Sequence, residues 1–285
     1  MRRCCFLALV AFSVTGCLLT LDSDRVQCKV DEDCVAHGLE NATCDTTDNV
    51  CVEAEDLVWG CVGNVEWDMA TSDPLVLNAR FRRLSDESPV EGAPAKLCGP
   101  LDAECTDPLD TGTTDSNGEL SLTGYYGFRG YTLVEPPPSY PNMAPAILWA
   151  SPPRFDEVAV EDIQPAHLTA VEVVSGIGLL LGVSVNPDAG HIFGLTGDWN
   201  QQPISNVTLR SEVVATDTEQ YYFDGSLPSK TATETDASGL GGFINVPAGL
   251  VTITATSLDV GRLGSATVLV KPGHITYLGI GPTPN

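Results

Sequence analysis

Short runs in which apolar and polar residues alternate occur through most of the chain after residue 58. Residues 75–82 (LVLNARFR) and residues 251–256 (VTITAT) show this most clearly, with one apolar face and one mainly polar face. This period of two predicts half-buried strands. Further short strands, separated by Gly and Pro, are expected at residues 95–98, 119–122, 130–134, 146–150, 191–195, 205–211, 221–223, 265–270 and 275–280. Many short strands at this spacing predict antiparallel β-sandwiches.

A longer-range pattern repeats among these strands. Residues 89–97 (PVEGAPAKL) and residues 203–209 (PISNVTL) both read Pro, aliphatic, any residue, Gly or Asn, then Ala or Val. Each is followed by the phrase T-D-x-x-G, at residues 114–118 and again at residues 235–239. Two matches in the same order indicate an internal duplication. We therefore expect two tandem sandwiches, over residues 58–157 and residues 183–285.

The chemistry of the repeated phrase predicts a turn. The carboxylates of Asp115 and Asp236 can accept hydrogen bonds from backbone N–H groups two or three residues later. Gly118 and Gly239 supply the positive φ that such a turn needs. We interpret each phrase as the central hairpin of its module.

One segment between the modules, residues 158–182, has a helical pattern instead. Pro165 suits a first helical turn, apolar residues recur every three positions, and Gly176 is a stop signal. We expect a linker helix over residues 164–174 that packs between the two modules.

The first residues resemble the signal of a bacterial lipoprotein. Two arginines follow the initial methionine, residues 4–14 are apolar, and V-T-G-C then ends at Cys17. The apolar run is too short for a transmembrane helix, which needs about 20 residues. The resemblance implies that residues 1–16 are removed and that Cys17 carries lipid, so that the lipid bilayer is a partner. Leu18, in place of Asp, then favours the outer membrane or cell surface. An ordinary signal peptide with an incidental cysteine is the alternative.

Residues 17–57, which we call the neck, are polar and rich in cysteine. Secreted proteins keep such cysteines as disulfides. The neck resembles the small Cys-rich repeats of lipoproteins and half of an EGF-like module. Three pairings of its four cysteines are possible, and we favour Cys28–Cys44 and Cys34–Cys51. Each would close a loop worth ~3 kcal/mol.

Two metal sites are the alternatives for the neck. Zinc would need thiolates, but paired C-x₂-C knuckles are absent and the compartment is oxidising. Calcium could bind the local carboxylates, although the EF-hand order is absent and a solvated acidic surface explains them better. These carboxylates belong to Asp31, Glu32, Asp33, Asp45 and Asp48.

Three further cysteines lie in the first module. We expect Cys98 and Cys105, which flank a turn that contains Gly and Pro, to form a local disulfide. Cys61 is then left over, and is either free or paired outside its module.

The charge balance makes nucleic acid an unsuitable partner. Acidic residues outnumber basic ones by 38 to 14, which gives a formal net charge of −24. A phosphate-binding face needs clustered Lys and Arg. The one local basic cluster, Arg80, Arg82 and Arg83, is better explained by a solvated strand face. An acidic surface suits an extracellular protein that must stay soluble.

The repeated pattern also resembles the carboxypeptidase regulatory-like domain. The second copy is the clearer, because residues 243–253 after its bend read FINVPAGLVTI, and the first copy has Y-G-F at the matching corner. The resemblance implies a transthyretin-like, Ig-like sandwich of seven strands in each module. It also implies a structural, adhesive or binding role on a secreted protein, and it brings no catalytic residues with it.

No catalytic motif is visible. The sequence has no G-x-S-x-G, no H-E-x-x-H and no phosphate loop, and its four histidines are scattered. The transthyretin-like hydrolases that open a urate product end in Y-R-G-S, whereas residues 281–285 read GPTPN. We therefore expect no enzyme, no cofactor and no resident metal.

Three hypotheses for function remain. The first is a lipid-anchored, non-enzymatic surface protein with a structural, binding or display role. The second is a calcium- or carbohydrate-binding adhesin that uses the neck carboxylates or an aromatic platform, although aromatic residues of a sandwich more often belong to its core and rim. The platform residues would be Tyr125, Tyr126, Tyr221 and Tyr222. The third is a secreted hydrolase, which would need histidines and carboxylates gathered in one cleft.

Overall fold

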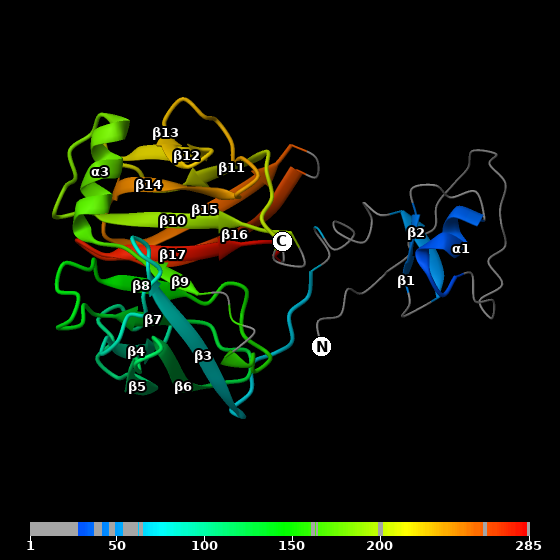
Figure 1. Ribbon diagram of the computed structural model, residues 1–285, viewed down its shortest axis with the longest axis horizontal. Coiled ribbons are helices and arrows are strands. Elements are labelled where there is room, and N and C mark those ends of the chain that lie inside the picture. Colours follow the sequence, from blue (N-terminus) through cyan, green and yellow to red (C-terminus); the bar gives the residue numbers. More distant parts are fainter. Residues whose placement is uncertain are drawn as a thin grey trace.

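The computed structural model describes residues 28–36, 42–45, 49–53, 62, 65–160, 163, 165–198, 202–258 and 261–283. These residues form packed sheets with little helix, which confirms the predicted all-β sandwich class (Figure 1). The predicted signal sequence, Cys17 and Cys61 lie outside the described residues.

The described residues of the neck form one short helix and one pair of strands. Helix α1 (Asp31–Ala36) is followed by strands β1 (Ala42–Asp45) and β2 (Val50–Glu53), which pair antiparallel.

The strands after the neck divide into two successive sets. The first set is β3 (Pro74–Arg83), β4 (Pro94–Cys98), β5 (Asp110–Thr113), β6 (Glu119–Tyr125), β7 (Tyr131–Val134), β8 (Ala146–Trp149) and β9 (Ala166–Leu168). The second set is β10 (Gly190–Thr196), β11 (Val207–Ser211), β12 (Glu219–Asp224), β13 (Leu227–Ser229), β14 (Leu240–Val246), β15 (Gly249–Ser257), β16 (Gly261–Val270) and β17 (Ile275–Ile280). We call them the first and second modules.

Six strands of each module share one pattern of pairing, while β5 pairs with β4 and β12 pairs with β14. In the first, β3 pairs antiparallel with β6 and parallel with β9, while β7 pairs antiparallel with β4 and β8. In the second, β10 pairs antiparallel with β14 and parallel with β17, while β15 pairs antiparallel with β11 and β16. The match supports the internal duplication inferred from the sequence. The parallel pairs differ from the purely antiparallel expectation, because the last strand of each module returns beside the first.

The modules are fused through their sheets. Strand β17 pairs parallel with β8, and this single ladder joins a sheet of each module into one of nine strands, ordered β13-β12-β14-β10-β17-β8-β7-β4-β5. Figure 1 shows these strands stacked through the height of the body. Two sheets of three strands, β6-β3-β9 and β11-β15-β16, complete the sandwiches.

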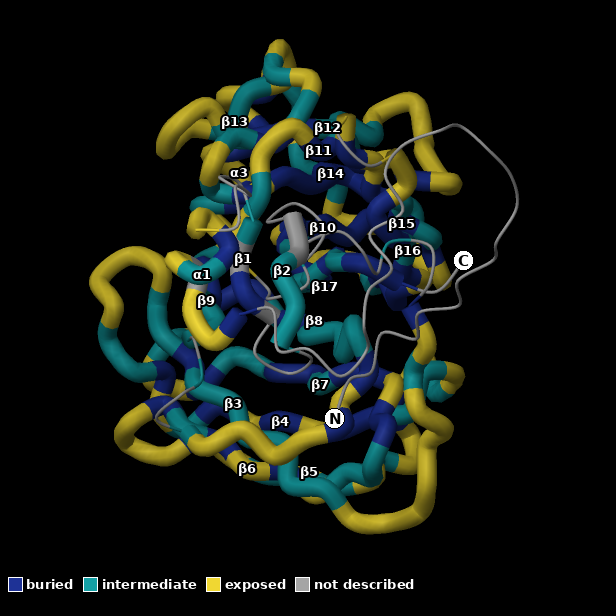
Figure 2. Tube along the Cα trace, turned by 90° about the vertical axis from the view of Figure 1, so that its right-hand side faces the viewer, coloured by how far each residue is buried: buried dark blue, intermediate teal, exposed yellow. Residues whose placement is uncertain are grey.

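The two small sheets cover opposite faces of the large one. On β8, Leu148 packs with the first module's core under β3 and β6, whereas its neighbour Ile147 points to the other face. On β17, Tyr277 lies beside Leu148, while Leu278 points to the other face, into the core under β15 and β16. Figure 2 shows the resulting band of buried residues along the large sheet, with exposed loops around it.

In the first module, the repeated phrase forms a network of hydrogen bonds around the buried Thr114. The hydroxyl of Thr114 donates to the carbonyl of Val90 (2.6 Å) and accepts from the N–H of Ala93 (2.9 Å). The carboxylate of Asp115 accepts from the N–H of Asn117 (2.8 Å). The threonine thus ties the bend to the loop between β3 and β4.

The second module repeats these bonds. The hydroxyl of Thr235 donates to the carbonyl of Ile204 (2.9 Å) and accepts from the N–H of Val207 (3.2 Å). The carboxylate of Asp236 accepts from the N–H of Ser238 (2.9 Å). The hydroxyl and N–H of Ser238 keep the pKa of Asp236 below its usual value.

The bend is not a hairpin, contrary to the sequence interpretation. In the first module it connects β5, in the large sheet, to β6, in a small sheet; in the second, β13 pairs with β12 and not with β14. The bonds that decide this are distant in sequence. The N–H of Phe81 donates to the carbonyl of Gly118 (2.8 Å), and the N–H of Thr196 donates to that of Gly239 (2.8 Å).

The predicted helix is also shifted along the chain. Residues 166–168 form strand β9, and helix α3 spans Val171–Leu181. Gly176 does not stop it, because the left-handed residue that ends the helix is Gly182, with φ 76°. The helix does not lie between the modules: its residues Val174, Ile177 and Leu181 pack on the second module's half of the large sheet.

We predict that the two bend glycines cannot be replaced. A Cβ on Gly118 would lie 2.3 Å from the carbonyl oxygen of Phe81, and one on Gly239 would lie 2.5 Å from that of Thr196. Each substitution to Ala should lower the free energy of unfolding in urea by about 3 kcal/mol or more, from strain plus the clash.

Gly92→Ala is the matched control. Gly92 has a similar φ of 78°, but a Cβ there meets nothing within 4 Å. The strain alone should cost about 1 kcal/mol. Equal losses for Gly118→Ala and Gly92→Ala would contradict the role given to the bend.

Candidate functional site

The second module's tyrosines do not form a binding platform. Tyr221 and Tyr222 are 1% and 2% exposed. The hydroxyl of Tyr222 accepts from the N–H of Leu209 (2.7 Å), and the ring of Tyr221 packs edge-on against Phe193 and Phe223. Burial raises the pKa of both tyrosines. The adhesin hypothesis was wrong to count them as surface residues.

The first module's tyrosines are half-buried at its rim. Tyr125 packs edge-on against Phe128, and Tyr126 packs edge-on against Phe155 while donating to Asp68 (2.9 Å). Both rings therefore make contacts within the first module, and they cannot form one platform with the buried Tyr221 and Tyr222.

All six cysteines that the structure describes are paired. The disulfides are Cys28–Cys44, Cys34–Cys51 and Cys98–Cys105. They are the pairs favoured from the sequence. The sulfur atoms of Cys28, Cys34 and Cys51 lie within 4.8 Å of one another, but as disulfides they offer no thiolate for zinc.

The neck carboxylates show no calcium cage in the described residues. The carboxylate of Asp33 accepts from the N–H groups of Lys29 (2.7 Å) and Val30 (3.3 Å), just before α1. Asp48 lies outside the described residues, as do the side chains of Asp31 and Asp45. Among described residues, no group of three carboxylates and histidines lies close enough to share an ion.

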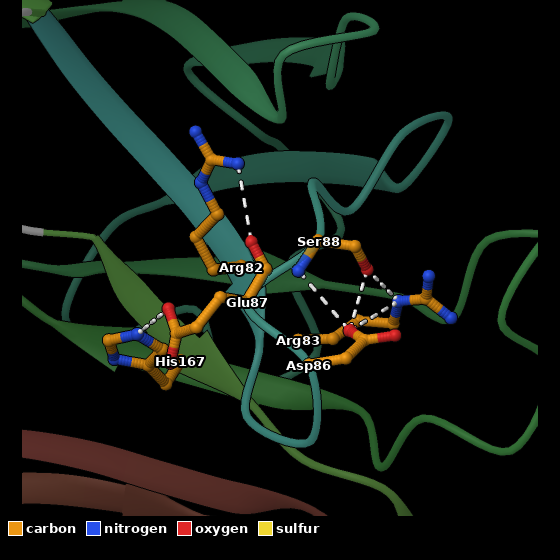
Figure 3. A network of polar contacts seen from close by, with 6 residues as sticks. All are labelled: Arg82, Arg83, Asp86, Glu87, Ser88 and His167. Atoms are coloured by element: carbon orange, nitrogen blue, oxygen red, sulfur yellow. Dashed lines mark hydrogen bonds and ion pairs between the residues drawn. The ribbon is translucent and has the colours of Figure 1, made fainter.

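The described histidines lie in different parts of the fold and make different contacts. His167 pairs with Glu87 (2.8 Å) at the surface, beside a second network in which Ser88 donates to Asp86 and Arg83 binds both (Figure 3). His274 contacts the carbonyl of Pro272 (2.8 Å). None of the three hollows lined by residues of β3, Trp67 or β11 contains a histidine, and His37 lies outside the described residues.

His191 is a structural acceptor. It is 3% exposed, and its Nδ1 accepts from the N–H of Asn245 (3.3 Å). Asn245 is fully buried in the left-handed conformation, and its side chain bonds to the backbone of Ser184, Asn186 and Asp217. Burial lowers the pKa of His191 to about 4.

A cavity of about 330 Å³ opens between the two sheets of the first module. Its wall is mainly apolar and is formed by Leu77, Ala79, Leu120, Leu122, Phe128 and Leu148. Asn78, Thr132 and Arg154 add polar groups, and the exposed Arg154 and Val158 lie at the rim. We call this cavity the sandwich pocket. The sequence did not predict it, because its residues alternate between apolar and polar as those of any half-buried strand do.

The sandwich pocket exists because the first module's last strand is short. Strand β17 pairs with residues 191–196 of β10, but β9 pairs only with residues 81–83 of β3. No described strand pairs with the same edge of β3 before Phe81. Two side chains of β3 bond there instead: Asn78 donates to the carbonyl of Val158 (3.0 Å) and Arg80 to that of Val160 (2.8 Å).

A shallower hollow lies where the modules meet. It is lined by Val65 and Trp67 from the segment before β3, by Arg129, and by Ser265 and Thr283 of the second module. Arg129 stacks on the ring of Trp67, with 5.1 Å from guanidinium carbon to ring centre.

Comparison with known proteins leaves the family open. No known family matches the chain, and no similar sequence is found among curated proteins. Matching solved structures include the shaft pilin SpaA from Lactobacillus rhamnosus GG, at 11% identity, covering 75% of this chain and 100% of that one, with a TM-score of 0.24. The minor pilin of Streptococcus agalactiae is 13% identical, covering 75% of this chain and 98% of that one, with a TM-score of 0.19.

The TIE protein of Bacillus anthracis also matches. It is 12% identical, and the match covers 74% of this chain and 34% of that one, with a TM-score of 0.24. This chain therefore spans about a third of that protein. TM-scores this low carry no conclusion about function.

We predict that His191 makes the fold sensitive to acid. Because its pKa is about 4 in the folded chain and 6.5 unfolded, the unfolded state binds the proton more readily between these values. Stability should therefore fall as the pH drops from about 7.5 to about 4.5, with His191 contributing about 2.5 kcal/mol of the loss.

Urea unfolding at the two pH values checks this. His191→Gln should shrink the loss by that amount, whereas His274→Gln, at the surface, should not. Since protonation of carboxylates such as Asp236 acts in the same direction, only the difference between variants isolates His191. A loss that is the same in both variants would assign the acid sensitivity elsewhere.

Proposed function

We propose that this chain is a lipid-anchored surface protein whose fused modules serve a structural or display role without catalysis. The observation that carries the location is the pairing of every described cysteine. Disulfides persist in oxidising compartments and are rare in the cytosol. The lipoprotein-like sequence that ends at Cys17 agrees with this location.

The fused sheet supports a structural role. The β8–β17 ladder leaves the modules no hinge between those strands. An ion pair adds to it, since Lys271 of the second module bonds to Glu104 (2.8 Å) and to the carbonyl of Ala103 (3.0 Å) in the first. Such a body resists bending, which suits a spacer or a platform.

The anchor in this proposal is the lipid on Cys17. Each buried methylene is worth ~0.8 kcal/mol, so several acyl chains on one cysteine attach a protein stably. Among the described residues, no helix is long and apolar enough to cross a bilayer. The shared bend supports the resemblance to carboxypeptidase regulatory-like domains, and membership of that group is part of the proposal.

Metabolic labelling tests the anchor. The full chain, made in a Gram-negative host with a palmitate analogue that carries an alkyne, should become labelled and fractionate with the outer membrane. Cys17→Ser should abolish the label, because the acylated sulfur is gone. Cys5→Ser is the matched control, since it makes the same change in the part that is removed.

A second substitution tests the destination. Leu18→Asp should leave the label in place and shift the protein to the inner membrane fraction. Labelling of Cys17→Ser at the level of the unchanged chain would sink the anchor, and equal fractionation of both chains would sink the outer-membrane assignment.

A further inference from the structure

The sandwich pocket is a gap that the second module does not share. Phe81 of the first module and Thr196 of the second occupy equivalent positions. The N–H of each donates to the carbonyl of the bend glycine in its own module, Gly118 or Gly239. In the second module a full-length β17 closes the edge of β10 before that point, and its residues Leu278 and Ile280 fill the core. The duplication therefore supplies an internal reference in which this edge of the first strand is closed. The second module's own hollow, of about 340 Å³, is lined instead by residues of β11, β12 and β14.

The sequence explains the gap. Residues 156–165 read DEVAVEDIQP, with four carboxylates and a proline, whereas β17 of the second module reads ITYLGI. Proline cannot donate to a ladder, and carboxylates do not enter a core unpaired. Among the described residues of this stretch, Val158 and Ile163 line the sandwich pocket, and none forms a strand that pairs with β3 as β17 pairs with β10.

The size and chemistry of the sandwich pocket suit one apolar chain. Its floor, made by Leu120, Leu122 and Phe128, is at most 5% exposed. Ligand sites are typically 300–1,000 Å³ and mainly apolar, with a few polar groups that fix orientation. An apolar cavity of about 150 Å³ binds benzene, so a volume of 330 Å³ takes roughly twice as many carbon atoms, about a dozen.

The rim supplies a place for a charged head. Arg154 is exposed at the mouth, and a guanidinium has five N–H donors, enough for a carboxylate beside its other contacts. Asn78 adds an amide at the same wall. Arg80, nearby on β3, pairs with Glu119 (3.1 Å).

We propose that the sandwich pocket binds a free medium-chain fatty acid. The acyl chain lies between the two sheets of the first module, and the carboxylate lies at Arg154. This site is independent of the acyl chains proposed on Cys17, and neither depends on the other.

Calorimetric titration of the purified full chain with dodecanoate tests the site. The chain carries Cys17→Ser, so that no attached acyl chain competes, and the dodecanoate stays below its micelle concentration. One molecule should bind per chain in the micromolar range. Methyl dodecanoate, which stands for esterified lipid, should bind at least tenfold more weakly, because it has no carboxylate for Arg154.

Two variants locate the site. Ala79→Leu, in the wall, should weaken dodecanoate at least tenfold by filling the cavity, while Ala159→Leu, exposed and outside the wall, should not. Arg154→Met should weaken dodecanoate about tenfold and leave the methyl ester unchanged, while Arg129→Met should change neither. Thermal unfolding shows whether each variant is folded. If Ala79→Leu does not fold, the effect of Arg154→Met alone tests the site.

Several results would overturn the proposal. If heat of binding appeared only above the micelle concentration of dodecanoate, the chain would have no specific site for it. Unchanged binding by folded Ala79→Leu would place the ligand elsewhere, as would an equal effect of Arg129→Met and Arg154→Met. Equal affinity for the acid and its methyl ester would reject the carboxylate and point to esterified lipid.

Discussion

The parallel ladder between β8 and β17 is the contact on which the body depends. Strand β17 is central in the large sheet, with β10 on one side and β8 on the other. Its side chains enter the cores on both faces, with Tyr277 on one and Leu278 on the other. Without it, each module would present an unpaired edge, and exposed edges promote aggregation. The last strand of the chain thus completes the first module as well as the second.

The features that could be predicted from the sequence are those formed by residues close to one another along the chain. The bends were predictable because an Asp, a Gly and their own backbone make most of the turn. Most strands were predictable from a period of two. The duplication followed from two phrases in the same order, and the equivalent bonds of Thr114 and Thr235 give it a physical content that the letters alone did not.

The errors share a different cause, which is long-range pairing. Residues 166–168 have a helical pattern but pair with β3, because Leu168 fits the core there with no exposed surface. The bend was taken for a hairpin, although it joins β5 and β6, which lie in different sheets, and Gly118 bonds to Phe81 of β3. Tyr222 was predicted to be a surface residue, but it is buried and its hydroxyl accepts a hydrogen bond from the N–H of Leu209. No local pattern in the sequence shows which distant segment a residue will contact.

The candidate site divides in the same way. The neck disulfides could be proposed from spacing and a resemblance, since cysteine chemistry leaves few options. The sandwich pocket could not, because Leu77, Leu120 and Leu122 have the pattern of ordinary core residues. Its signal lies in a difference between two copies, and it becomes visible only once Phe81 and Thr196 are known to be equivalent.

The hollow where the modules meet has a mechanical consequence. Val65, near the start of the double module, and Thr283, near its end, line the same depression. The backbone therefore arrives and leaves at one corner. Tension applied between these two points would act across that corner. A body tied in this way would swing as one piece under flow, and it could be spliced into a loop of a larger protein without stretching either partner.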